Sequence, residues 1–325
     1  MVRTTVVGSY PRIGDAPEEQ KLRRAIARFE EGKIDGEQLR EVERETIRDV
    51  VREQLKAGIS LVADGQVTWY DSQSHFARRL AGFEIDGLVR YFDTNTYYRQ
   101  PVRTGPARWN EPIVLDDWRT AQGAGEATPA KAIMTGPYTL ASLAKLGGAR
   151  VCDVALELAT ALSREVSALA SAGAKVVQVD EPALVRRPED IAIVAETTAR
   201  LSAAKGSAAL HLFTSFGDVA SVWDDLTELP VDNLGVDLVQ GEATLKAIRR
   251  LGSPVPLTLG LVDARNTRRE DPRAVAKTVV GLRDRIPLAD SYLAPSNGLE
   301  FLPRANAREK LAIVVEAAKV VGEAA

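Results

Sequence analysis

The alternation of short apolar runs with amphipathic helical stretches is the feature that most limits how this chain can fold. The runs are rich in β-branched residues, which is typical of strands buried on both faces of a parallel sheet. Eight runs fit this description, at residues 4–8, 60–64, 132–135, 175–180, 208–213, 233–239, 256–261 and 291–295.

Amphipathic helices are predicted between these strands. Within residues 36–57, Leu39, Val42, Ile47 and Val50 fall largely on one stripe, and charged residues occupy the rest of the surface. Strands that alternate with helices predict right-handed β-α-β units and a parallel sheet. Eight such strands favour an α/β fold of the closed (β/α)8 type, a TIM barrel, over an open doubly wound sheet. Further helices are predicted at residues 153–172, 188–204, 243–251, 272–286 and 307–321.

Residues 66–130 break this rhythm. Four aromatic residues lie close together between positions 91 and 98, and little helical period is visible after position 88. We interpret the segment as a long insertion after the second strand that lies over the barrel mouth, because long irregular segments in compact domains are usually functional. We expect residues 1–325 to form a single barrel domain that includes this insertion.

Composition excludes several classes of protein. The chain has 42 basic and 45 acidic residues, for a net charge of −3, so it lacks the basic excess of a nucleic-acid binder. No apolar run approaches the roughly 20 residues that span a bilayer. The N-terminus runs directly into a predicted strand, which leaves no room for a signal peptide. The single cysteine, Cys152, permits no internal disulfide and fits a reducing cytoplasm. One cysteine also cannot build a thiolate-rich zinc site.

Polar residues follow the predicted strands at the end where such barrels carry their active sites. Their carboxylates, amides and hydroxyls suit an amino acid or a polar heterocycle as ligand. The candidate binding residues are Ser9, Arg12, Asp64, Gln66, Asp237, Asp263, Arg265, Asn266 and Asn297.

Two adjacent carboxylates, Asp180 and Glu181, end the fourth predicted strand, and Pro182 stops that strand from continuing. Either carboxylate could hold a substrate ammonium or act as a general base. The alternative is a structural pair that caps the next helix or meets Arg186 or Arg187. The residues leave both interpretations open.

His211 is a third catalytic candidate, although a histidine inside an apolar strand is more often a core residue than a ligand. A basic cluster of Lys21, Arg23 and Arg24 could bind an anionic tail such as a polyglutamate. Charge runs of this kind are more often a solvated helix face.

Several motifs occur in the order found in one known family. Residues 7–14 read VGSYPRIG, residues 64–71 read DGQVTWYD, residues 91–98 read YFDTNTYY, residues 178–184 read QVDEPAL and residues 259–266 read LGLVDARN. These motifs resemble the cobalamin-independent methionine synthase family, and most closely its amino-terminal barrel. The family is built from two related barrels.

The resemblance implies methyl transfer from 5-methyltetrahydrofolate to homocysteine. It implies that Asp93 and Asn95 of the third motif, together with Lys21, Arg23 and Arg24, help to bind the folate. The catalytic barrel of the family holds zinc through an H-x-C motif, an acidic residue and a late cysteine. Here the corresponding regions read His211-Leu212-Phe213 and, over residues 295–299, PSNGL. Both cysteines are replaced, so we assign no metal ligand and expect no bound cofactor.

Three functions follow from this pattern. The chain could be the folate-binding half of a split methionine synthase that works with a separate zinc-bearing barrel. It could instead be a stand-alone methyl or alkyl transferase with a different acceptor, in which His211 or Glu181 acts as the base. It could also be a non-catalytic barrel that binds folate or an amino acid. We favour the first and expect small-molecule substrates, with neither nucleic acid nor membrane as a partner.

Overall fold

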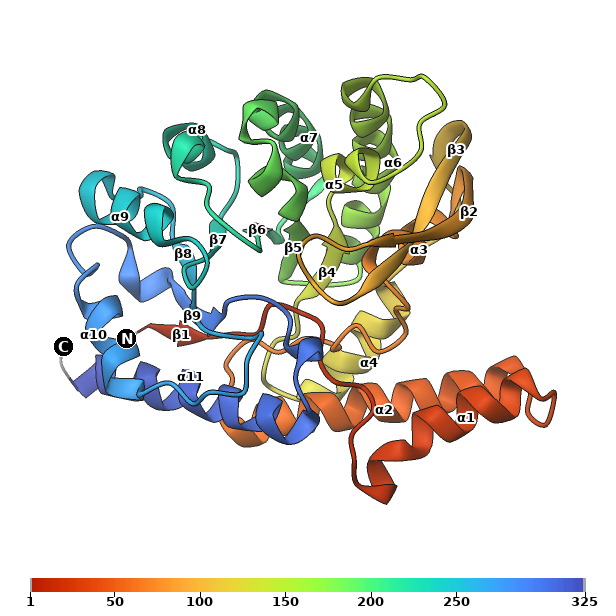
Figure 1. Ribbon diagram of the computed structural model, residues 1–325, viewed down its shortest axis with the longest axis horizontal. Helices are drawn as coiled ribbons and strands as arrows, with labels where there is room; N and C mark the ends of the chain where they lie inside the picture. Colours follow the sequence, from red (N-terminus) through yellow and green to blue (C-terminus); the bar gives the residue numbers. More distant parts are fainter. Residues whose placement is uncertain (1, 324–325) are drawn as a thin grey trace.

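A closed parallel sheet forms the centre of the computed structural model, which describes residues 2–323. Within that span the sheet has seven named strands, arranged as a curved wall surrounded by helices (Figure 1). Their order is β1 (Arg3–Thr4), β9 (Tyr292–Pro295), β8 (Leu257–Val262), β7 (Asn233–Asp237), β6 (Ala209–Thr214), β5 (Val176–Asp180) and β4 (Ala132–Thr135).

The eighth position is filled by the segment predicted as the second strand. Thr5 forms a parallel bridge with Leu61, and Val62 forms one with Ala130, next to β4. The Val62 amide donates to the Pro129 carbonyl at 3.1 Å, and the Lys131 amide donates to the Val62 carbonyl at 2.9 Å. These contacts join the two edges of the sheet, and the predicted α/β barrel is confirmed.

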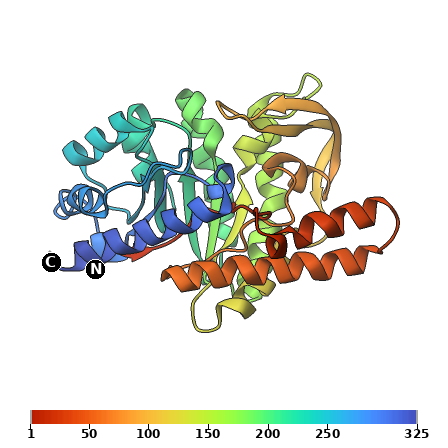
Figure 2. The same ribbon diagram turned by 60° about the horizontal axis from the view of Figure 1, so that its bottom comes forward.

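The outer helices follow the predicted pattern with shifted ends. α2 (Gly36–Ala57) begins after Asp35, whose side chain accepts a hydrogen bond from the Gln38 amide at 2.8 Å, and it ends at Gly58 with φ 95°. α1 (Lys21–Glu30) pairs with α2 in a hairpin that projects beyond the barrel (Figure 2). The remaining long helices are α6 (Val151–Ser171), α7 (Ile191–Ala204), α9 (Glu242–Leu251), α10 (Pro272–Val280) and α11 (Arg304–Glu323).

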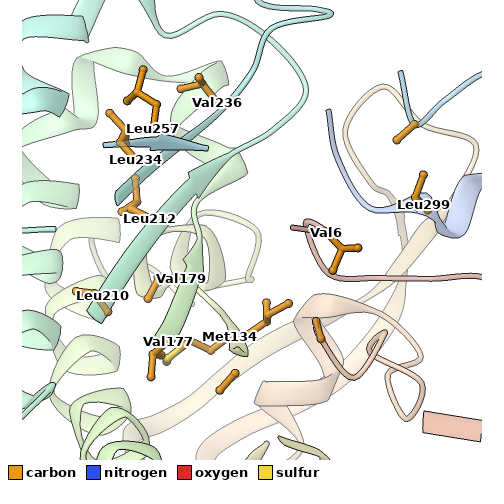
Figure 3. Close-up of a cluster of buried hydrophobic side chains, with 14 of the residues drawn as sticks. Val6, Met134, Val177, Val179, Leu210, Leu212, Leu234, Val236, Leu257 and Leu299 are labelled. Atoms are coloured by element: carbon orange, nitrogen blue, oxygen red, sulfur yellow. The ribbon is translucent and has the colours of Figure 1, made fainter. Parts of the chain in front are cut away.

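The main apolar core lies between the sheet and these helices. Alternate residues of neighbouring strands belong to this core, and each is at most 2% exposed (Figure 3). Burial of each such side chain contributes about 1.5–3 kcal/mol relative to exposure. The intervening residues of the same strands point to the barrel interior. The labelled core residues include Val177, Val179, Leu210, Leu212, Leu234 and Val236.

The insertion is more regular than its sequence suggested. It contains α3 (Ser72–Ala77), an antiparallel hairpin of β2 (Leu80–Arg90) and β3 (Tyr97–Trp109), and α4 (Leu115–Gly125). Two register shifts in the hairpin, between positions 81 and 83 and between 85 and 88, break the two-residue alternation by which strands are recognised. The turn of the hairpin lies over the barrel mouth, whereas α4 packs against α2.

A buried carboxylate ties the insertion to the barrel. Glu165 on α6 is fully buried and accepts hydrogen bonds from Trp109 Nε1 at 2.7 Å, the Ile113 amide at 2.8 Å and the Val114 amide at 2.9 Å. Trp109 is the last residue of β3, and the two amides belong to the segment that leads into α4.

None of the helices in the described chain combines the length and apolar character that a membrane crossing requires.

Replacement of this carboxylate should destabilise the fold. We expect Glu165→Ala to lower the free energy of unfolding by about 3 kcal/mol, because two buried amides and the half-buried Trp109 indole N–H lose their acceptor. Urea denaturation followed by circular dichroism measures the change. The control is Glu196→Ala on α7, whose side chain is 56% exposed and ion-paired with Arg200, and which should change stability by less than about 0.5 kcal/mol. Equal losses in the two variants would contradict the role given to Glu165.

Candidate functional site

A cavity opens at the carboxyl ends of the strands, where the barrel meets the insertion. It holds about 910 Å³ of empty space, part of it continuous with solvent. Its barrel side comes from the ends of β1, β4, β5, β6 and β9, and its other side from residues 66–72 and the hairpin turn. Four predicted site residues line it: Ser9, Gln66, Asp180 and Asn297.

Asp180 is the catalytic candidate that the structure places in the cavity wall. Its Oδ1 accepts a hydrogen bond from Gln178 Nε2 at 2.7 Å. Burial raises the pKa of the Asp180 carboxyl above its ordinary value, while the hydrogen bond from Gln178 and the charge of Lys131 act in the opposite direction. A carboxylate in this position can receive a ligand's ammonium or take up a proton.

Two buried polar atoms of the cavity wall have no hydrogen-bond partner within residues 2–323. They are the donor Nε1 of Trp69 and the acceptor Oδ1 of Asn297. Asn297 Nδ2 donates to Ser296 Oγ at 3.2 Å, which fixes the orientation of the amide. Buried polar atoms are almost always paired in folded proteins, so an unpaired donor and an unpaired acceptor on two residues that line one cavity point to a polar ligand.

Backbone strain gathers at the same mouth. Gln66 (φ 52°) and Phe216 (φ 73°) line the cavity, and Phe92 (φ 48°) stacks on Phe216 with 5.5 Å between ring centroids. Asp237 supports the strained loop, because its Oδ2 accepts from the Phe216 amide at 3.2 Å. Non-glycine residues in the left-handed region are uncommon and tend to mark functional sites.

The other two catalytic candidates do not line the cavity. Glu181 is buried and accepts from the Tyr138 amide at 3.0 Å, the Thr139 amide at 2.7 Å and Thr139 Oγ1 at 2.6 Å. These donors lie at the start of α5 (Pro137–Ser142), which precedes Glu181 in the chain, whereas the structural alternative had the pair capping the next helix or meeting Arg186 or Arg187. Burial raises the pKa of Glu181 to about 7. His211 pairs in register with Gln178, one layer below Asp180, and burial lowers its pKa to about 3.

Three predicted binding carboxylates shape the loops at the strand ends. Asp64 accepts from the Gln66 amide at 3.2 Å, and burial raises its pKa to about 7. Asp237 accepts from the amides of residues 239 and 240, each at 3.0 Å, and burial raises its pKa to about 6. Asp263 accepts from the Arg265 amide at 2.8 Å and from Asn266 Nδ2.

The remaining predicted binding residues lie on or near the insertion, or away from the cavity. Arg265 donates to the Asp93 carbonyl at 2.5 Å, which ties the hairpin turn to the barrel. The side chain of Asp93 is 91% exposed, and Asn95 is exposed beside it. Arg12 donates to the carbonyls of Val67 at 2.9 Å and Trp69 at 2.7 Å.

The basic cluster lies on α1 and does not line the cavity. Lys21 is ion-paired with Asp49 at 2.6 Å and with Glu45 at 3.5 Å, both on α2. Arg23 and Arg24 are exposed, and Arg24 donates to the Pro17 carbonyl at 3.0 Å.

Sequence reasoning missed several residues that the insertion and the short helix after the last strand contribute to the cavity: Trp69, Tyr70, Asp71, Tyr91 and Glu300. The cluster of aromatic residues at positions 91–98 was a usable signal for the hairpin turn. Tyr70 is 52% exposed at the mouth, and three guanidinium groups surround its ring. The distances from ring centroid to guanidinium carbon are 5.2 Å for Arg99, 5.4 Å for Arg12 and 6.0 Å for Arg78.

The residues at the family's zinc positions do not form a metal site. The ring of Phe213, which follows His211 by two residues, packs directly over Gly235 on the next strand. Asp237 is already occupied by three backbone amides, and Asn297 offers an amide in place of a thiolate. In residues 2–323, no three His, Cys, Asp or Glu side chains gather where they could hold a metal ion.

Comparison with known proteins gives a consistent result. The family model described as the catalytic domain of cobalamin-independent synthase matches residues 2–320. The methionine synthase of Saccharolobus solfataricus is 32% identical over 326 residues, which cover 99% of this chain and 96% of that protein. The methionine synthase of Sulfolobus acidocaldarius is 30% identical, covering 98% of this chain and 92% of that protein.

The fold is shared with a solved structure, a B12-independent methionine synthase from Shewanella sp. W3-18-1 in complex with selenomethionine. The TM-score is 0.81 at 19% identity, covering 100% of this chain and 98% of that chain. The matching family model describes the catalytic domain, so the closer likeness to the amino-terminal barrel stays a prediction from motifs. The match over residues 2–320 and the 32% identity along nearly the whole chain establish that this protein belongs to the cobalamin-independent methionine synthase family, a family of methyltransferases.

Proposed function

We propose that this protein takes part in methyl transfer from 5-methyltetrahydrofolate to homocysteine, forming methionine in the cytoplasm, together with a separate zinc-bearing barrel. The observation that carries the proposal is the cavity in which Asp180 lies with the unpaired donor of Trp69 and the unpaired acceptor of Asn297. Relatives of nearly the same length bear the name methionine synthase, and the Shewanella structure contains selenomethionine. Both facts support an amino-acid site in this fold.

The polar atoms of the cavity suit the two charged groups of an amino acid. Asp180 and Asn297 Oδ1 would accept hydrogen bonds from its ammonium, and Trp69 Nε1 would donate to its carboxylate. Hydrogen bonds that involve a charged partner are roughly twice as strong as neutral ones, and in a buried site they are little screened.

The arginines around Tyr70 suit the other substrate. A folate carries an aromatic ring that ends in a glutamate or polyglutamate tail, and the exposed Tyr70 ring with Arg78 and Arg99 offers a stacking surface beside positive charge. Tyr70 lines the cavity and both arginines contact its ring, whereas no residue of the α1 cluster lines the cavity. We therefore place the glutamate carboxylates of the methyl donor beside Tyr70, at Arg78 and Arg99.

Methyl transfer requires a thiolate. The sulfur–carbon bond forms as the carbon–nitrogen bond of the methyl donor breaks, and the electron pair goes to the folate nitrogen, which takes up a proton. The thiol must first lose its proton, which an adjacent metal or cationic group favours. Since the zinc-position residues of this chain fit no metal, we assign thiol activation to the partner barrel.

A reconstitution experiment tests this assignment. We expect no methionine from the purified protein with homocysteine, triglutamyl 5-methyltetrahydrofolate and zinc, and methionine when a separate zinc-bearing barrel of the family is added. Methionine formed without that barrel would show that this chain activates the thiol unaided. If matched halves give neither complex nor product, the transferase with a different acceptor and the non-catalytic binder become the better hypotheses.

Asp180→Asn should weaken the use of homocysteine. We expect kcat/KM for homocysteine in the reconstituted reaction to fall at least about tenfold, because the variant keeps the shape of the side chain but loses the charge that meets the ammonium. The matched control is Asp86→Asn on β2 of the hairpin, whose side chain is 70% exposed, pairs with Lys145 at 3.0 Å and does not line the cavity, so activity should stay within twofold. Equal activity of both variants would remove Asp180 from the site.

Removal of the mouth arginines should affect the donor. We expect Arg78→Ala with Arg99→Ala to raise KM for the triglutamyl donor about tenfold, since each exposed charge contact is worth up to about 1 kcal/mol. KM for homocysteine should not change. The comparison variant is Arg23→Ala with Arg24→Ala on α1. If this second pair has the larger effect on the donor, the tail lies on α1, as the sequence alone suggested.

A further inference from the structure

A buried lysine lies beneath the cavity floor. Lys131 is 1% exposed and directly precedes β4. Its Nζ donates to two neutral oxygens inside the barrel, Gln178 Oε1 at 2.6 Å and the backbone carbonyl of Val6. A buried lysine is rare unless it has a specific electrostatic role, because burial penalises its charged form.

The lysine fixes the orientation of the Gln178 amide. An ammonium can only donate, so the amide oxygen must face Lys131 and the amide nitrogen must face away from it. That nitrogen donates to Asp180 Oδ1 at 2.7 Å and to the Val7 carbonyl at 2.7 Å. Asp180 therefore meets a hydrogen-bond donor, which favours its carboxylate form over its protonated form.

We propose that Lys131 is a positioning residue that acts through Gln178 to keep Asp180 ionised and directed into the cavity. Lys131 does not line the cavity, whereas Asp180 does. The identity of the ligand that Asp180 meets rests on the proposed function. The relay from Lys131 to Asp180 is a property of the protein without ligand.

Charge explains why a lysine is needed at this place. Burial raises the pKa of Asp180, and the positive charge of Lys131 lowers it; burial lowers the pKa of Lys131, and the charge of Asp180 raises it. Without the lysine, Asp180 would take up a proton at higher pH and lose its attraction for an ammonium. The other titratable groups around Asp180 are Glu181, His211, Tyr91, Asp71 and Glu300.

The test measures the titration of Asp180 directly. Aspartate labelled with ¹³C at the carboxyl group is followed by NMR from pH 4 to pH 9, and the Asp180 signal is assigned by its absence in Asp180→Asn. Lys131→Met removes the charge and keeps an apolar side chain of similar length. We expect the midpoint for Asp180 to rise by about one pH unit or more in this variant. Gln178→Met breaks the relay while the lysine stays in place, and it should also raise the Asp180 midpoint. This variant replaces Lys131→Met in the test if Lys131→Met does not fold.

The matched control is Lys310→Met. Lys310 is also 1% exposed, but its Nζ pairs with Glu270 at 2.8 Å, and neither residue lines the cavity. Its loss should lower stability without moving the Asp180 midpoint. A shift in this control equal to that in Lys131→Met would show general destabilisation and overturn the relay.

A second experiment tests whether the relay affects ligand binding: the affinity for methionine is measured by calorimetry over the same pH range. Wild-type affinity should fall about tenfold for each pH unit below the Asp180 midpoint, and in Lys131→Met this fall should begin at correspondingly higher pH. If wild type binds no methionine but the NMR midpoint moves as expected, the relay stands and the proposed ligand is wrong. An unchanged NMR midpoint in both Lys131→Met and Gln178→Met would overturn the inference.

Discussion

The closure of the sheet by residues 61 and 62 is the constraint on which the site depends. These residues bridge Thr5 on one side and Ala130 on the other, and so join the two edges of the sheet, β1 and β4. With the sheet closed, Ser9, Asp180 and Asn297, which are far apart in sequence, stand around one opening. The short closing strand also leads directly into Asp64 and Gln66, where the insertion begins. The pairing of residues 61 and 62 thus closes the barrel and also fixes the point from which the insertion extends over the barrel mouth.

The cavity is a joint product of the barrel and the insertion. The barrel contributes carboxylate, hydroxyl and amide groups on rigid strand ends. The insertion contributes Trp69, Tyr70 and Tyr91, together with Arg78 and Arg99, two of the three arginines around Tyr70. Glu165 and Arg265 hold the insertion to the barrel at two separate places. The barrel and the insertion therefore each contribute polar groups to the interior and arginines to the rim.

The fold could be predicted from sequence because the signals that specify it are local and repeated. Each buried strand shows its apolar run, and α2 was predicted over its observed residues, 36–57, from its apolar stripe; in the structure Asp35 and Gly58 cap these ends. The hairpin of the insertion was not predicted, because its register shifts interrupt the alternation that identifies strands. Among site residues, Asp180 was identified by its place at a strand end. Glu181 has the same sequence signal, yet it faces the opposite way and binds the start of α5. The direction of a side chain after the last strand residue depends on the local backbone, which sequence pattern does not report.

The packing of Phe213 on Gly235 has a consequence for how this protein can change over time. A Cβ at position 235 would lie 2.0 Å from the Phe213 ring, so any larger residue there requires a smaller one at 213. A cysteine at 213 without a second change would leave a void of the kind that destabilises a core by about 3–5 kcal/mol. The two positions are therefore coupled, and a lineage carrying this pair cannot recover a thiolate at 213 by one neutral step. The aromatic ring that packs on Gly235 therefore also keeps a cysteine from being readily accepted at position 213.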